Sequence, residues 1–191
     1  MKGFVGIMRK SGVLLPVSSI PSPYGIGAFS KEAYAFIDLL EKAGQSYWQI
    51  LPLGPTGYGD SPYQSFSTFA GNPYYIDLEA LIEEGYLTKA ECEQYDFGDD
   101  AVYVDYEKIY LSRFKVLRKA YQNSHIEEDQ AYQKFVEENA YWLKDYALYM
   151  AVKNSFGGKS WSEWDEDIRL RKPAAIEKYA GQYAQEIAFY Q

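Results

Sequence analysis

Residues 12–53 contain the pattern that sets the fold class. They begin with the apolar run Gly12-Val13-Leu14-Leu15-Pro16-Val17 and end with the apolar run Tyr47-Trp48-Gln49-Ile50-Leu51-Pro52-Leu53. Short apolar runs of this kind predict buried strands. Between them an apolar stripe with helical spacing follows Ser30 and stops before Gly44, which predicts a capped helix. The stripe consists of Ala33, Phe36, Ile37 and Leu40. The order strand, helix, strand predicts a parallel sheet and an α/β fold.

A long polar and aromatic loop, Gly54 to Pro73, follows the second predicted strand, and Tyr74–Leu78 is expected to form a third strand. A loop of this length is usually functional, and ligands of parallel sheets bind beyond the carboxyl ends of the strands. Its side chains mix aromatic rings with short hydrogen-bonding groups, as a sugar site requires. The alternative interpretation is an elaborate turn whose tyrosines pack on the body of the fold.

Composition excludes several classes of partner. The 191 residues carry 19 Lys and Arg against 27 Asp and Glu, a formal net charge of -8. An acidic chain repels a phosphate backbone, so nucleic acid is not an expected partner. No stretch approaches the roughly 18 apolar residues that span a bilayer, and residues 1–10 lack a secretory signal. A membrane is therefore not expected as a partner, and the expected location is cytoplasmic.

Metal and cofactor binding are not expected either. Cys92 is the single cysteine and His125 the single histidine, so no internal disulfide and no cysteine-based metal site can form. Gly54–Gly59 lacks the Gly-Lys-Ser/Thr ending of a phosphate-binding loop. Adjacent carboxylates such as Asp165-Glu166-Asp167 are interpreted as solvated surface rather than as a catalytic pair.

The chain becomes helical after residue 78. A short helix is expected to stop at Gly85, and Thr88-Lys89-Ala90-Glu91 has the form of a capping box. The longer expected helices span 106–122, 129–153 and the segment that opens at Pro173. The apolar stripe of the last helix still runs at Gln191 without a stop signal. Since a closed (β/α)8 barrel takes at least about 200 residues, we expect this chain to be the front part of a larger protein.

Two groups of motifs point to one family. The upstream group comprises Leu14-Leu15-Pro16-Val17-Ser18-Ser19-Ile20-Pro21 and Pro23-Tyr24-Gly25-Ile26-Gly27. The second group comprises Tyr47-Trp48-Gln49-Ile50-Leu51-Pro52-Leu53-Gly54-Pro55 and Gly57-Tyr58-Gly59-Asp60-Ser61-Pro62-Tyr63. With these motifs, and more loosely with Trp161-Ser162-Glu163-Trp164, the whole chain resembles the 4-α-glucanotransferases. This family is also called amylomaltase, disproportionating enzyme or glycoside hydrolase family 77.

The resemblance implies the N-terminal part of a (β/α)8 TIM barrel of the α-amylase type with a largely helical insertion. Residues 1–78 would hold the first strands and helix of the barrel, with the substrate loop at 54–73. Residues 79–175 would form the helical insertion subdomain. Residues 176–191 would start a barrel helix that runs into a missing C-terminal part.

The resemblance also implies transfer of 1,4-α-glucan segments between maltooligosaccharides, so α-1,4-glucans are the expected partners. The anomeric configuration would be retained through a covalent glycosyl-enzyme, which requires two carboxyl groups about 5–5.5 Å apart. These catalytic carboxylates are expected beyond Gln191, and no catalytic residue is assigned within the chain.

Substrate contacts can be carried over from the resemblance. Ser61 and Tyr63 match family positions on the donor side of the cleft, where the serine hydrogen-bonds hydroxyls and the tyrosine stacks on a glucose ring. Tyr58, on the same loop, could stack on a glucan outside the cleft, and Tyr106 matches a position near such an outer groove. Asp60 belongs to the same substrate-binding group, although its expected part is to stabilise the loop by capping or an Asx turn.

Two other functions stay open. A non-catalytic α-glucan-binding module would use the tyrosine loop alone. An α-amylase-type hydrolase would pass the glycosyl intermediate to water instead of to a sugar. A binding module should end in a helix stop signal, which distinguishes it from the front part of a larger protein. The resemblance of segment Gly57–Tyr63 to the family favours transfer over hydrolysis.

Overall fold

The computed structural model describes residues 9–100 and 102–191. It divides into two compact units, residues 1–120 and residues 121–191. Residues 1–8, on which the expectation of no secretory signal largely rests, lie outside the described part of the chain. The division into 1–78, 79–175 and 176–191 that the resemblance implies differs from these compact units, and it stays a prediction.

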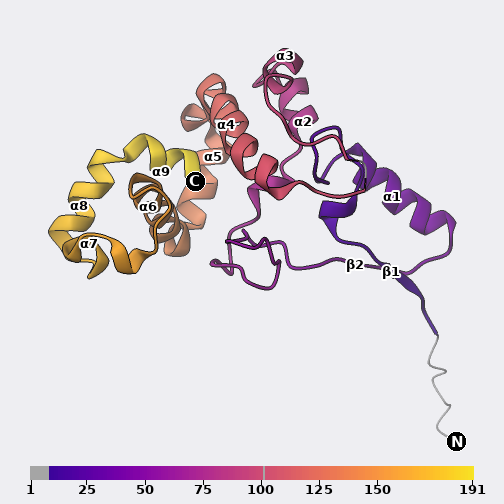
Figure 1. Ribbon diagram of the computed structural model, residues 1–191, viewed down its shortest axis with the longest axis horizontal. Coiled ribbons are helices and arrows are strands. Elements are labelled where there is room, and N and C mark those ends of the chain that lie inside the picture. The colour runs from indigo at the N-terminus through magenta and orange to yellow at the C-terminus, as the bar shows by residue number, and fades with distance from the viewer. Residues whose placement is uncertain (1–8, 101) are drawn as a thin grey trace, which may run out of the picture. The chain divides into compact units, whose positions relative to one another are not determined.

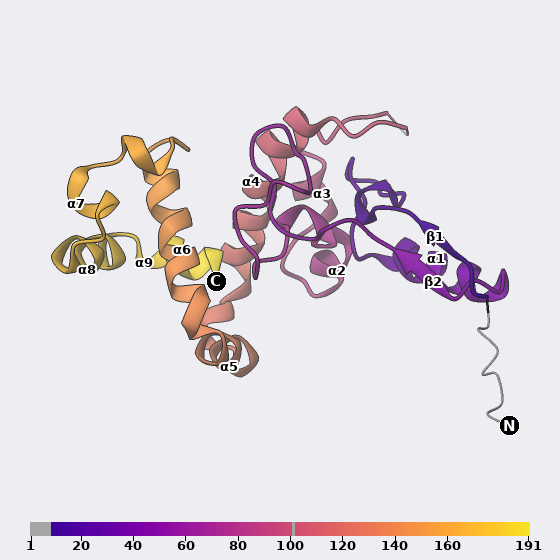
Figure 2. The same ribbon diagram turned by 90° about the horizontal axis from the view of Figure 1, so that it is seen from below.

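The first unit opens with a two-stranded parallel sheet. Strand β1 (Gly12–Leu14) pairs with β2 (Tyr47–Gln49), and Val13 lies opposite Trp48. Helix α1 (Lys31–Lys42) connects the strands and ends before Gly44, whose φ of 67° suits glycine. The predicted strand–helix–strand unit is confirmed, and Figures 1 and 2 show the two strands side by side.

Both strands are more exposed than a buried sheet would be. Leu14 is 55% exposed and Tyr47 is 60% exposed, so the prediction that the first strand is buried is wrong. The cause is the size of the sheet, which within residues 9–100 and 102–191 has two strands and no further strand on either edge. The apolar stripe of α1 is also only partly covered, since Ala33 is buried whereas Ile37 is 47% exposed.

Residues 73–78 form helical turns, so the prediction of a third strand is wrong. A 3-10 turn, η2 (Pro73–Tyr75), is followed by α2 (Leu78–Glu83). The side chain of Asn72 accepts a hydrogen bond from the backbone N–H of Tyr74 at 3.0 Å, and Asp77 caps α2 in the same way. Because two helical turns begin only five residues apart, at Asn72 and Asp77, residues 74–78 cannot form an extended strand despite their apolar side chains.

After residue 78 the first unit is mainly helical, as predicted. Helix α3 (Lys89–Cys92) begins with a complete capping box, in which Thr88 and Glu91 each bond the other's backbone N–H. Helix α4 (Tyr106–Ser124) covers the helix predicted at 106–122. Tyr110 of this helix is 64% exposed and lies outside its buried face. The buried residues of α4 are Ile109, Ser112, Arg113, Val116, Leu117 and Ala120.

The second unit consists of helices, which Figure 1 draws in colours from salmon through orange to yellow. Their bounds are α5 (Gln130–Glu138), α6 (Ala140–Ser155), α7 (Glu166–Arg169), α8 (Pro173–Gln182) and α9 (Ala184–Tyr190). The helix predicted over 129–153 breaks at Asn139, and the last predicted helix breaks at Tyr183. Pro173 opens α8 as predicted.

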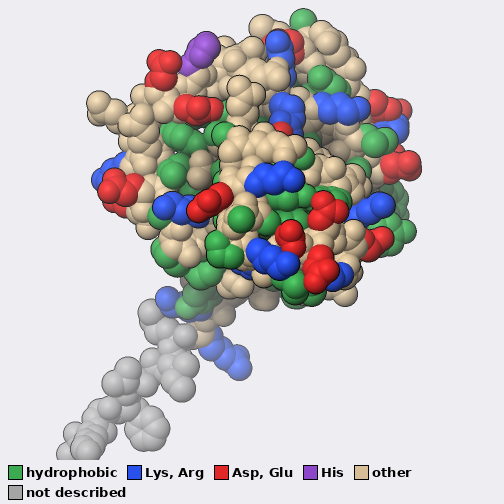
Figure 3. Space-filling model, turned by 90° about the vertical axis from the view of Figure 1, so that its left-hand side faces the viewer, with side chains coloured by type: hydrophobic (Ala, Val, Ile, Leu, Met, Phe, Trp, Pro, Cys, Tyr) green, Lys and Arg blue, Asp and Glu red, His purple; other side chains and the backbone are tan. Residues whose placement is uncertain are grey.

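Stacked aromatic rings form the core of the second unit. Phe156 stacks on Trp164 at 5.8 Å between ring centroids and on Tyr179 at 6.4 Å. Val152 and Ile168 are buried in the same cluster. Figure 3 faces the side of α7 and α8 and shows acidic and basic side chains interspersed. The face in view therefore presents mixed charge around an apolar core.

Candidate functional site

The loop that follows β2 is ordered by short backbone contacts. Thr56 and Ser65 form an antiparallel bridge. The backbone N–H of Asn72 donates to the carbonyl of Leu53 at 2.8 Å, which closes the base of the loop. At its tip, Asp60 has a left-handed φ of 51°. Aspartate and asparagine tolerate this region better than most residues, so the tip depends on the residue type at this position.

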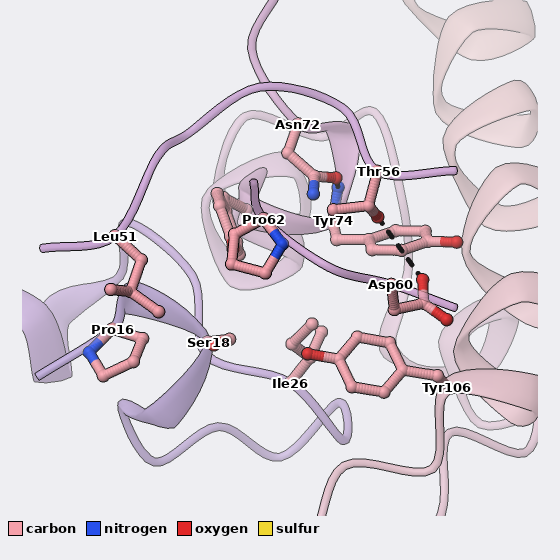
Figure 4. Close-up of a pocket in the computed structure, with 11 residues that line it drawn as sticks. Pro16, Ser18, Ile26, Leu51, Thr56, Asp60, Pro62, Asn72, Tyr74 and Tyr106 are labelled. Carbon is pink, nitrogen blue, oxygen red and sulfur yellow. Dashed lines mark hydrogen bonds between the residues drawn. The ribbon is translucent and has the colours of Figure 1, made fainter. Parts of the chain in front are cut away.

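A cavity of about 240 Å³ lies under this loop (Figure 4). The loop contributes Thr56 and Asp60, η2 contributes Tyr74, and the first turn of α4 contributes Tyr106. Ser18 and Ile26, from the segment between β1 and α1, line it from below in the view of Figure 4. Segments far apart in the chain thus surround a space with both rings and polar groups.

Asp60 is the charged group of the cavity. Its carboxylate lies between Tyr74 and Tyr106 in Figure 4, and the hydroxyl of Thr56 donates to its Oδ1 at 3.3 Å. Burial raises the pKa of Asp60 above its usual value, and the Thr56 hydrogen bond partly offsets that rise. With one oxygen engaged by Thr56, the carboxylate can still accept hydrogen bonds from a ligand.

The tyrosines of the cavity are held in their neutral form. Burial, and after it the negative charge of Asp60, raises the pKa of Tyr74 and of Tyr106. A hydrogen bond with Ser18 works in the opposite direction on the pKa of Tyr106. Near neutral pH both hydroxyls can therefore donate and accept hydrogen bonds beside the carboxylate.

The structure brings together two of the predicted site residues, Asp60 and Tyr106. Tyr58 is fully exposed and Tyr63 is 73% exposed, so both rings are open to solvent at the loop. Ser61 is half-buried next to Asp60 in the chain and does not line the cavity. The substrate-binding roles of these five residues stay predictions.

Sequence reasoning missed Tyr74 and Ser18 as parts of the site. Tyr74 was hidden by the expectation of a strand, in which alternate residues would face opposite sides. The dipeptide Asn72-Pro73 was the available signal, because asparagine followed by proline is typical of a helix start. Ser18 lies within one of the family motifs but has no chemical signature of its own.

Among the residues that the structure describes, no group of three or more His, Cys, Asp or Glu side chains could hold a metal ion. Likewise, no helix within 9–100 and 102–191 is long and apolar enough to cross a membrane.

The family model for 4-alpha-glucanotransferase matches residues 15–191. The chain therefore belongs to the 4-alpha-glucanotransferase family, which confirms the resemblance that its motifs carry. It is 51% identical to a 4-alpha-glucanotransferase of Clostridium butyricum over 174 residues, which are 91% of this chain and 36% of the relative. It is 45% identical to one of Thermus thermophilus over 186 residues, 95% of this chain and 36% of the relative.

A solved structure shares the fold. The amylomaltase from Streptococcus agalactiae in complex with acarbose matches with a TM-score of 0.89 and 41% sequence identity, over 96% of this chain and 37% of that chain. The chain thus spans about 36% of the length of the curated relatives it matches.

Proposed function

We propose that the cavity beneath residues 54–73 binds α-1,4-glucans within a protein that transfers 1,4-α-glucan segments between maltooligosaccharides. One observation carries the proposal: a carboxylate, Asp60, lies between two neutral tyrosines in a cavity built by the segment that matches the family. A tyrosine ring covers the apolar C–H face of a glucose unit, and the carboxylate and hydroxyls read its hydroxyl groups.

The exposed loop side chains extend this proposal. Tyr58 and Tyr63 present open rings on which further glucose units can stack, and Ser61 offers a hydroxyl to the same chain. Tyr63 and Ser61 would serve the donor side of the catalytic cleft, and Tyr58 would hold a glucan in an outer groove. Tyr106, a wall of the cavity, would lie near that groove. The acarbose complex of the amylomaltase relative supports a site for glucan-like ligands in this family.

The catalytic step is proposed to use residues outside this chain. Retention through a covalent glycosyl-enzyme needs a nucleophile and an acid/base carboxylate. Since the relatives are about two and a half times as long as this chain, we place both carboxylates beyond Gln191. In the same proposal β1 and β2 are the first strands of a (β/α)8 barrel, residues 79–175 are its helical insertion, and the enzyme works in the cytoplasm.

The test is a product analysis of the complete natural protein with maltotriose. Transfer predicts glucose together with oligomers longer than maltotriose. Hydrolysis would give glucose and maltose without longer products, and a binding module would give no products at all. Either of those outcomes would overturn the proposed function.

A further inference from the structure

Arg113 is a buried cation in an unusual position. It lies on α4 and is 1% exposed. Among the described residues, it is the largest fully buried side chain. Its Nη2 donates to the backbone carbonyl of Tyr74 at 2.9 Å and also to that of Ile76. Within the described part of the chain, its Nε and Nη1 have no hydrogen-bond partner.

Such a burial is costly. Removing a guanidinium from water costs several kcal/mol of folding free energy, unless a charge partner and further hydrogen bonds compensate for the lost hydration. Burial lowers the pKa of Arg113 to about 10, and the nearby carboxylate of Asp77 only partly offsets this. An apolar side chain of similar volume would fill the space without the desolvation cost. Packing alone therefore does not explain an arginine here.

The two carbonyls explain what an arginine provides. Tyr74 and Ile76 bracket the end of η2, the turn that carries one wall of the cavity, and a guanidinium can reach both from a single planar group. The opposite wall is Tyr106, seven residues before Arg113 on the same helix. Seven residues are close to two helical turns, so both side chains lie near one face of α4, roughly 10 Å apart along its axis.

We propose that Arg113 is a positioning residue that sets the gap between Tyr74 and Tyr106 and so determines how tightly the cavity holds a glucan. This inference rests on the proposed function. Phe114, the next residue of α4, supports the same junction, since its ring meets that of Tyr74 edge-on at 6.1 Å between centroids. The ring contact fixes the tilt of Tyr74, and the arginine fixes the backbone behind it.

The test compares Arg113→Met with Val116→Ala in the complete natural protein. Val116 is a fully buried residue of the same helix that does not line the cavity, so its truncation serves as a control for lost stability. Val116→Ala should lower the Tm because it leaves a cavity. Arg113→Met loses two hydrogen bonds but also the desolvation cost, so its Tm should change less. Only Arg113→Met should raise the KM for maltoheptaose, by about tenfold, while kcat stays within about twofold of wild type, because a displaced wall weakens binding without touching the reacting groups. An unchanged KM in Arg113→Met, or an equal rise in Val116→Ala, would overturn the proposal.

A second readout does not depend on catalysis. Crystal structures of the two variants should show the separation of the Tyr74 and Tyr106 rings altered by about 1 Å in Arg113→Met and unchanged in Val116→Ala. If the wild type forms no longer oligomers from maltotriose, the proposed function fails, and the ring separation alone then decides the role of Arg113. Should Arg113→Met not fold, Arg113→Lys replaces it, since a single ammonium cannot reproduce the planar fork.

Discussion

Asp60 carries a charge where the folded state disfavours one. Burial raises its pKa, so the stability that its protonated form contributes is fully present below the usual value near pH 4 and is lost as the pH rises through the raised value. We predict that Asp60→Asn stabilises the protein at pH 7 by about 0.5 kcal/mol, the size usual for a change near the surface. Asparagine also tolerates the left-handed φ of 51°.

Urea unfolding at pH 7 and below pH 4 measures this effect. The increase in the free energy of unfolding should disappear at the lower pH, because both proteins are then neutral at residue 60. A gain of the same size at both pH values would show that backbone preference, and not the charge, is its source.

The same carboxylate makes glucan affinity depend on pH. An ionised acceptor forms a stronger hydrogen bond than an amide does. In the complete natural protein, Asp60→Asn should therefore raise the KM for maltoheptaose about fivefold near pH 7. In the wild type the KM should rise as the pH falls through the raised pKa of Asp60. The facing titratable groups, Tyr74 and Tyr106, stay neutral throughout, because their pKa values are raised. An identical pH profile of KM in the variant would contradict this prediction.

The family resemblance was enough to predict Asp60, in the loop motif, and Tyr106, on α4, as site residues, and both line the cavity. The resemblance was not enough to predict the cavity itself. Its walls include Ser18, Tyr74 and Ile26, which meet only when the chain folds back on itself. Arg113 was equally hidden, because an arginine in an amphipathic helix is normally expected on the solvent side.

At the scale of elements, the start of η2 is the feature on which the cavity wall depends. Asn72 is 7% exposed and caps this turn through Tyr74. We predict that Asn72→Ala costs about 1 kcal/mol, as the loss of a helix cap usually does. Thr88→Ala, which removes the cap of α3, is a matched control of similar cost. Chemical denaturation should show both losses, whereas the KM for maltoheptaose should rise in Asn72→Ala alone.

Local signals predicted some elements and not others. The glycine after α1, the capping box at Thr88 and the proline that opens α8 act over one turn, and the structure contains all three. The strand predicted at Tyr74–Leu78 failed because two capping side chains outweighed β propensity. The break at Asn139 was missed because the apolar spacing continues across it, although asparagine often ends a helix.

At the scale of the whole molecule, the first unit leaves apolar surface uncovered. Leu14, Leu39 and Tyr34 are 55%, 60% and 69% exposed on β1 and α1. We predict that residues 1–191 produced alone associate with one another, since exposed apolar side chains and open strand edges favour association. Light scattering should give a mass above 21.9 kDa that increases with concentration. Leu14→Lys should reduce it, and a monomer at every concentration would contradict the prediction.

The hydrogen bonds from Arg113 to the carbonyls at η2 also have a consequence for folding during translation. The arginine leaves the ribosome 39 residues after Tyr74, whose carbonyl it will hold. At the usual 5–20 residues per second, that interval lasts about 2 to 8 s. Until Arg113 has emerged, the carbonyls of Tyr74 and Ile76 cannot accept its hydrogen bonds. We therefore expect slower translation just before codon 113 to prolong a stage in which this turn lacks that support.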